Sequence, residues 1–251
     1  MKKHIILLIL ILPLLGNGET GQGKDNDHDP SRVETNINGK GYQITIRFHA
    51  GEAHNYPSMA IWTETMYGEF IQPLFVTSSF GKGVYRYGEQ SENKWKSGTR
   101  RYKAALPYFI HKWTKSDSNG GFIIPSPEQP VPDAYTAATP SSDFILKTKT
   151  SNKQESKFRI VLEINQAWDF NEYWHNARFP GNSQYKASCQ PSLIYAVTID
   201  TRNPMESYVM NPVGHGHYAG ANGKMYTDLS TITTAKNIAE RIEVDIQKSS
   251  D

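Results

Sequence analysis

Apolar and polar residues alternate along several short stretches of the chain, and this pattern is typical of half-buried β-strands. In residues 42–50 every second side chain is apolar, namely Tyr42, Ile44, Ile46 and Phe48. Side chains at that spacing share one face of a strand. Further strands are predicted within 143–150, 157–166, 191–200, 206–212 and 240–247. Residues 58–79 carry two apolar runs around Tyr67-Gly68 and predict a hairpin.

Helical periodicity is almost absent. Residues 106–116 form one plausible helical turn, because Pro107 suits a first helical position, and residues 234–240 have a second, weaker helical pattern. Residues 81–106 are polar and Gly-rich, which predicts a long loop or a ragged strand pair, and a Pro-rich stretch follows on the surface. We predict an all-β fold: an antiparallel, immunoglobulin-like β-sandwich with one short helix and long loops.

The N-terminus has the pattern of a secretory signal peptide. Two lysines precede an apolar run from Ile5 to Leu15, and small residues follow up to Gly18. We therefore expect a signal peptide at 1–18, a flexible spacer at 19–32, a β-sandwich domain at 33–166 and a C-terminal β-rich extension at 167–251, packed on the same sandwich. The mature chain is expected in the periplasm or outside the cell. It is not expected to be a lipoprotein, since no cysteine follows the apolar run.

Charge and cysteine content exclude some classes of partner and some covalent features. The full chain has 27 basic and 25 acidic residues, and removal of Lys2 and Lys3 leaves 25 of each. A neutral chain argues against a nucleic-acid partner. No other stretch is long and apolar enough to predict a transmembrane segment in the mature chain. Cys189 is the only cysteine, so it cannot form an internal disulfide, and we expect it to be buried.

The segment "GHGHYAGANGKMYTD", residues 214–228, is the first candidate site. Asn222-Gly223 is typical of a two-residue type I′ hairpin turn. That turn would pair His217 with Asp228 and His215 with Ser230, and it would place both histidines and Asp228 on one face. Two imidazoles and a carboxylate are ligands for a divalent metal ion, with His175 or His54 as a further donor. A structural His–Asp hydrogen bond is the alternative interpretation.

The segment "NQAWDFNEYWHNARFPGN", residues 165–182, is the second candidate site. Trp168, Tyr173 and Trp174 stand among polar residues, a combination suited to stacking on a sugar ring or a flat cofactor. The alternative is a loop whose aromatic side chains cover one end of the core. Asp169 and Glu172 are too close in sequence to predict a glycosidase pair, and no catalytic residues are predicted.

Three stretches resemble a known family. They are "MAIWTETMYGEFIQPLFVTSSFGKG", "LPYFIHKW" and "PDAYTAATPSSDFIL". Their order is similar to that of the bacterial periplasmic domain of unknown function 2271, over about residues 42–165. The resemblance implies an exported immunoglobulin-like β-sandwich. It also implies an accessory role beside a membrane or periplasmic redox or iron-uptake protein. The family offers no catalytic residues to carry over.

Three classes of function follow. The first is an exported, non-catalytic accessory or binding protein whose ligand is a metal ion or a metal-bearing cofactor, held by His215, His217, Asp228 and His175. The second is a carbohydrate-binding module that uses Trp168, Tyr173 and Trp174. The third is a metal-dependent hydrolase, which would need a third protein ligand and an open coordination position. The ligand's identity and the oligomeric state do not follow from the sequence.

Overall fold

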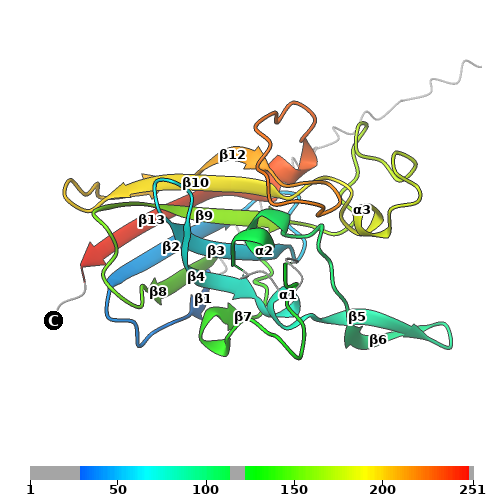
Figure 1. The fold of residues 1–251 in the computed structure, drawn as a ribbon, viewed down its shortest axis with the longest axis horizontal. Coiled ribbons are helices and arrows are strands. Elements are labelled where there is room, and N and C mark those ends of the chain that lie inside the picture. The colour runs from blue at the N-terminus through cyan, green and yellow to red at the C-terminus, as the bar shows by residue number, and fades with distance from the viewer. Residues whose placement is uncertain (1–28, 114–121, 249–251) are drawn as a thin grey trace, which may run out of the picture.

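Two β-sheets pack face to face and form the body of the protein (Figure 1). The computed structural model describes residues 29–113 and 122–248. The predicted signal peptide and most of the predicted spacer lie outside the described residues. The predicted all-β sandwich is confirmed.

The first sheet has the strand order β1-β8-β2-β13-β11. Its strands are β1 Ser31–Glu34, β8 Phe144–Lys149, β2 Tyr42–Ala50, β13 Ala239–Lys248 and β11 Tyr208–Val209. The second sheet has the order β12-β10-β9-β3-β4-β7. Its strands are β12 Asn211–His215, β10 Leu193–Asp200, β9 Lys157–Asn165, β3 Ser58–Glu64, β4 Phe70–Thr77 and β7 Thr136–Ala137.

Most strand pairs are antiparallel, as predicted, but β1–β8 and β4–β7 are parallel. Both parallel pairs involve a short strand at the edge of its sheet. A third, separate sheet consists of the hairpin β5 Val84–Ser91 and β6 Lys94–Thr99, which projects from the sandwich (Figure 1). For this segment the sequence predicted a long loop or a ragged strand pair, and the structure has the strand pair, with a register shift between Tyr85 and Glu89.

The alternating apolar and polar residues of β2 place one face of this strand in the main core. Its four alternating apolar side chains are buried, whereas the residues between them are only partly covered. They meet apolar side chains of the opposite sheet, among them Leu162 and Ile164 of β9. Removal of this apolar surface from water is the main force that holds the two sheets together.

A second apolar cluster lies on the other face of the second sheet. Helix α2, Pro107–Trp113, covers this face and packs Phe109 against Trp62 of β3, with ring centroids 5.6 Å apart. This is the helix that the sequence predicted. Helices α1 Ser78–Lys82 and α3 Ser183–Ser188 and the 3₁₀ turns η1 Asp133–Tyr135 and η2 Thr234–Asn237 complete the described secondary structure.

Strands from the C-terminal part of the chain belong to both sheets of the sandwich. Strand β10 pairs with β9, and β13 pairs with β2 along almost its whole length. The connections between these strands leave two long loops at one end of the molecule. Among the described residues, no helix has the length and apolar character needed to cross a membrane.

Candidate functional site

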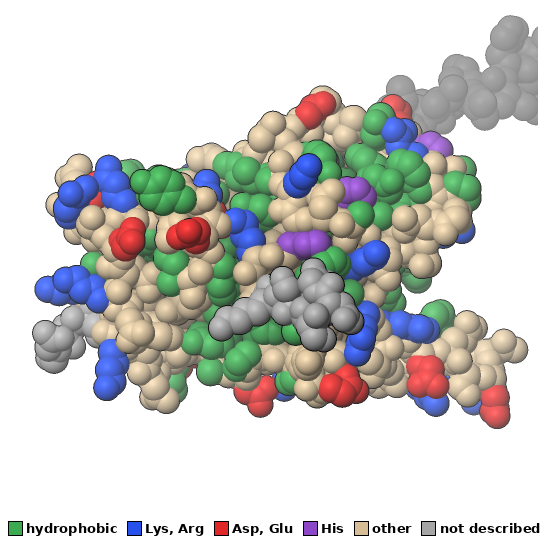
Figure 2. All heavy atoms as spheres, in the orientation of Figure 1, with side chains coloured by type: hydrophobic (Ala, Val, Ile, Leu, Met, Phe, Trp, Pro, Cys, Tyr) green, Lys and Arg blue, Asp and Glu red, His purple; other side chains and the backbone are tan. Residues whose placement is uncertain are grey.

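Two loops that are distant in sequence lie together at one end of the sandwich. One loop, residues 166–192, joins β9 to β10, and the other, residues 216–233, follows β12 (Figure 1). The Tyr218 ring stacks on Phe179 with centroids 4.2 Å apart, and it lies 6.1 Å from the Trp174 ring. Figure 2 shows hydrophobic side chains and histidines gathered over this region. The structure therefore brings the two sequence-predicted segments into contact.

Asp169 anchors the first loop to the body of the protein. Its carboxylate accepts a hydrogen bond from the Thr234 hydroxyl, and its carbonyl accepts the backbone N–H of Gln190 at 3.0 Å. Burial raises the pKa of the Asp169 carboxyl. Glu172, by contrast, is exposed. Asp169 is thus a structural anchor for the loop.

The residues on either side of Asp169 point outward. Trp168 is 70% exposed and Phe170 is 43% exposed. Trp168 also has a φ of +60°. Cys189, whose backbone forms an isolated parallel β-bridge with Asp169, has a φ of +67°. Side chains other than glycine pay a steric cost in this region, of roughly 1–2 kcal/mol per residue. Two such residues side by side mark a strained segment, a feature that clusters at binding sites.

Cys189 is buried, as the sequence predicted, and it is a free thiol. Burial and the nearby Asp169 carboxylate raise its pKa to about 11. The thiol is therefore protonated at neutral pH, and its role at this site is to pack behind the exposed residues.

Tyr173 and Trp174 are adjacent in sequence but differ in exposure. Tyr173 is 42% exposed, and the Arg178 guanidinium lies 3.6 Å from the centre of its ring. Trp174 is only 7% exposed, and its indole N–H donates to the Thr231 hydroxyl at 3.1 Å. The predicted stacking role of Trp174 does not fit this burial, because its ring already packs against neighbouring rings. We define the aromatic surface as Trp168, Phe170 and Tyr173.

The predicted turn and register of the histidine segment are wrong. His215 exchanges two backbone hydrogen bonds with Tyr226, at 2.8 and 2.9 Å, where the prediction paired it with Ser230. Neither Asn222 nor Gly223 has the positive φ that a type I′ turn requires. The chain instead forms a loop from 216 to 225. The local turn signal is overridden because this loop packs against residues 103–111.

The predicted metal ligands do not converge on one point among the described residues, and most of them contact other groups. His215 stacks on Tyr226 and contacts its neighbouring Gly216 carbonyl through Nδ1, and His217 Nδ1 accepts the backbone N–H of Ala219 at 3.0 Å. Asp228 accepts the backbone N–H of Ser230, and its pKa is lowered first by hydrogen bonds from Ser230 and also by the nearby His215. His175 is exposed, and His54 contacts the Ile238 and Pro140 carbonyls. Within residues 29–113 and 122–248, no group of three or more His, Cys, Asp or Glu side chains is arranged to hold a metal ion. Metal binding stays a prediction that rests on the His215–His217 pair.

The sequence did not point to His111 of α2, which lies near the second loop. Its pKa is lowered, chiefly by burial and also by the neighbouring His217. A hydrogen bond to the backbone of Gly220 raises the pKa but does not offset this effect. The pKa of His217 is likewise lowered, first by burial and then by Lys103 and His215. These positions are about a hundred residues apart in the chain, so no local spacing could have revealed the pair.

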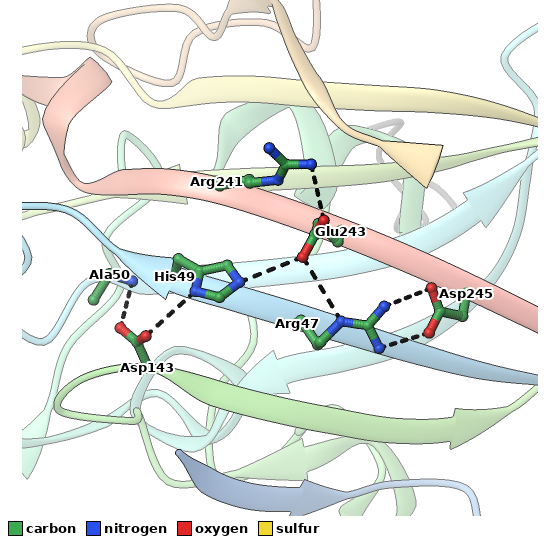
Figure 3. A network of polar contacts seen from close by, with 7 residues as sticks. All are labelled: Arg47, His49, Ala50, Asp143, Arg241, Glu243 and Asp245. Carbon is green, nitrogen blue, oxygen red and sulfur yellow. Dashed lines mark hydrogen bonds and ion pairs between the residues drawn. The ribbon is translucent and has the colours of Figure 1, made fainter. Parts of the chain in front are cut away.

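A separate network of six ionisable residues lies on the outer face of the first sheet (Figure 3): Arg47, His49, Asp143, Arg241, Glu243 and Asp245. Arg47 binds the Asp245 carboxylate through two hydrogen bonds of 2.6 and 2.7 Å, and His49 lies 3.4 Å from both Asp143 and Glu243. A hollow of about 440 Å³ borders the network. The network joins side chains of β2 and β13 to one another and to Asp143, which directly precedes β8.

No protein-family model matches the chain, and no curated protein or solved structure matches it either. The family resemblance of residues 42–165 therefore stays a prediction.

Proposed function

We propose that the protein is an exported, non-catalytic saccharide-binding protein and that the aromatic surface is its ligand site. The proposal rests on the solvent exposure of the Trp168 side chain. This large apolar side chain is mostly exposed, on a strained backbone that hydrogen bonds of Trp168 and Asp169 tie to residues 187–190. Export is supported by the N-terminal sequence pattern.

The aromatic surface suits a sugar because a sugar ring has an apolar face and a polar rim. Indole and phenol rings stack on such a face, and nearby polar groups bind the rim. Glu172 and Arg178 flank Tyr173 and supply groups of both signs. Asn171 orients the loop, since its side-chain oxygen accepts the backbone N–H groups of Tyr173 and Trp174 at 2.9 and 2.6 Å. The backbone that carries Tyr173 is therefore held in place before any ligand binds, which lowers the entropic cost of binding.

Two ionisable residues behind the aromatic surface, Asp169 and Cys189, favour binding over catalysis because neither offers a free reactive group. Asp169 is buried, with one carboxylate oxygen accepting the Thr234 hydroxyl and the other, Oδ2, enclosed without a hydrogen-bond partner among the described residues. The Cys189 thiol is protonated at neutral pH. The accessory role beside a redox or iron-uptake protein, which the family resemblance implied, is compatible with saccharide binding but has no separate support in the two loops.

A glycan array tests the proposal with four forms of the full chain: the unaltered protein, Trp168→Ala, Tyr173→Ala and Trp95→Ala. Trp95 is the matched control, because it is a 53% exposed tryptophan on the separate β5–β6 hairpin. Covering about 100 Å² of indole is worth about 2.5 kcal/mol, so Trp168→Ala should weaken binding at least tenfold. Trp95→Ala should bind as the unaltered protein does. An array without signal, or a signal that only Trp95→Ala removes, would refute the proposal.

A further inference from the structure

The partly buried arginines of the described residues differ in what they bind. Arg47 is paired with Asp245, and Arg159 is paired with the buried Glu64. Arg178 is also partly buried, but it forms no ion pair with an acid of the described residues. A guanidinium that has lost part of its hydration normally binds an acid, because the lost water contacts otherwise go uncompensated.

The surroundings of Arg178 keep its charge available. One face of the guanidinium covers Tyr173, and the Trp174 and Phe179 rings lie 5.4 and 5.6 Å away. Nη1 donates to the Tyr173 carbonyl over a long 3.4 Å, while Nε is buried without an acceptor among the described residues. Glu172, the acid nearest in sequence, is not ion-paired with it. Aromatic rings hold the cation in position without neutralising it.

We infer that the ligand of the aromatic surface is an acidic saccharide and that Arg178 binds its carboxylate. The inference rests on the proposed function and adds the ligand's chemical class. A uronic acid residue presents a ring for stacking and a carboxylate at the ring's edge. The Arg178 guanidinium covers one face of the Tyr173 ring, so the sugar ring would stack on the exposed Trp168 and its carboxylate would meet the guanidinium beside that contact. Arginine binds carboxylates through two parallel hydrogen bonds.

The experiment uses an array that holds neutral glycans, uronate-containing glycans, and the same uronate glycans as methyl esters. Esterification removes the charge and keeps the ring, so it isolates the proposed contact. The full chain is compared with Arg178→Gln, Arg178→Lys and Arg86→Gln. Arg86 is the matched control because it also lies over a tyrosine, Tyr87, at 5.3 Å. Near-ultraviolet circular dichroism checks that each variant retains its packed aromatic cluster.

We expect the unaltered protein to bind uronate glycans and to lose about 10- to 100-fold in affinity for their methyl esters. Arg178→Gln should show the same loss for the acids and little change for the esters. Arg178→Lys should fall between, since it keeps the charge and loses the planar fork.

Equal binding of acids and esters, or Arg178→Gln binding that equals the unaltered protein, would overturn the inference and leave the proposed function standing. If only Arg86→Gln lost binding to uronate glycans, the ligand site would lie on the β5–β6 hairpin and the inference would be overturned. An array without any signal would refute the proposed function, and the inference would fall with it.

Discussion

Glu163 of β9 provides a stability prediction that can be worked out from the structure. Its carboxylate is fully buried and accepts the backbone N–H groups of Tyr108 and Phe109 at 3.1 and 2.7 Å and the Ser192 hydroxyl at 2.5 Å. Glu163 thereby satisfies the first N–H groups of α2 from a neighbouring strand. Burial is the dominant effect on this group and raises its pKa to about 7, against the three hydrogen bonds.

The sign of the pH effect follows from that shift. Because the folded pKa lies above the unfolded value of 4.5, folding favours the protonated carboxyl. The stabilisation is fully present below pH 4.5 and is lost as the pH rises through 7. A shift of this size corresponds to about 3 kcal/mol, because one pKa unit is worth about 1.36 kcal/mol.

The substitution Glu163→Gln removes the titration and replaces one acceptor by a donor that faces an N–H group. It should destabilise the protein by about 1–3 kcal/mol at pH 4.5, where the native carboxyl is protonated. The deficit should shrink as the pH rises to 8, because only the unaltered protein loses stability there. Urea unfolding of both proteins from pH 4.5 to 8 measures the difference, and Glu240→Gln, at an exposed position, is the control. A free-energy difference that stays constant across this range would refute the reasoning.

Two further predictions concern local features. Glu92 and Asn93 form the tip of the β5–β6 hairpin, with φ of +49° and +61°. Because asparagine tolerates positive φ better than glutamate, Glu92→Asn should stabilise the hairpin by up to about 1 kcal/mol. Slower amide hydrogen exchange in β5 and β6 would verify this prediction, and faster exchange would contradict it. The folded pKa values of His111 and His217 are lowered from 6.5, so stability should be present above pH 6.5 and fall as the pH drops below it. His217→Asn should reduce that acid-dependent loss in urea unfolding between pH 7.5 and 5; an unchanged loss would exclude a contribution from His217.

Strand positions could be predicted because burial on one face imposes a period of two. The alternation in the stretch 41–50 predicted β2, and the run 157–166 predicted β9. The short helix after Pro107 was also predictable, since its apolar residues and first-turn proline agree. These features depend on neighbours within ten residues.

The site was less predictable, because long-range packing decides it. Asn222-Gly223 has the strongest local turn signal, yet the two-residue hairpin turn with positive φ at both positions occurs at Glu92-Asn93, where the sequence signal is weaker. A free hairpin obeys its turn residues, whereas a loop packed on α2 follows its tertiary contacts. Likewise, sequence selected Trp168 and Trp174 together, and only their packing shows which ring is exposed.

The central claim is that saccharide binds at Trp168. The five tryptophans each give one indole N–H signal in a ¹⁵N–¹H correlation spectrum, and Trp168→Phe and Trp95→Phe assign the two exposed ones. The full chain is titrated with oligogalacturonate, an alginate oligomer and a cello-oligosaccharide. The account predicts that at least one of the acidic oligomers shifts the Trp168 signal and leaves that of Trp95 in place. A Trp168 signal that stays unmoved by all three saccharides, or a shift confined to Trp95, would contradict it.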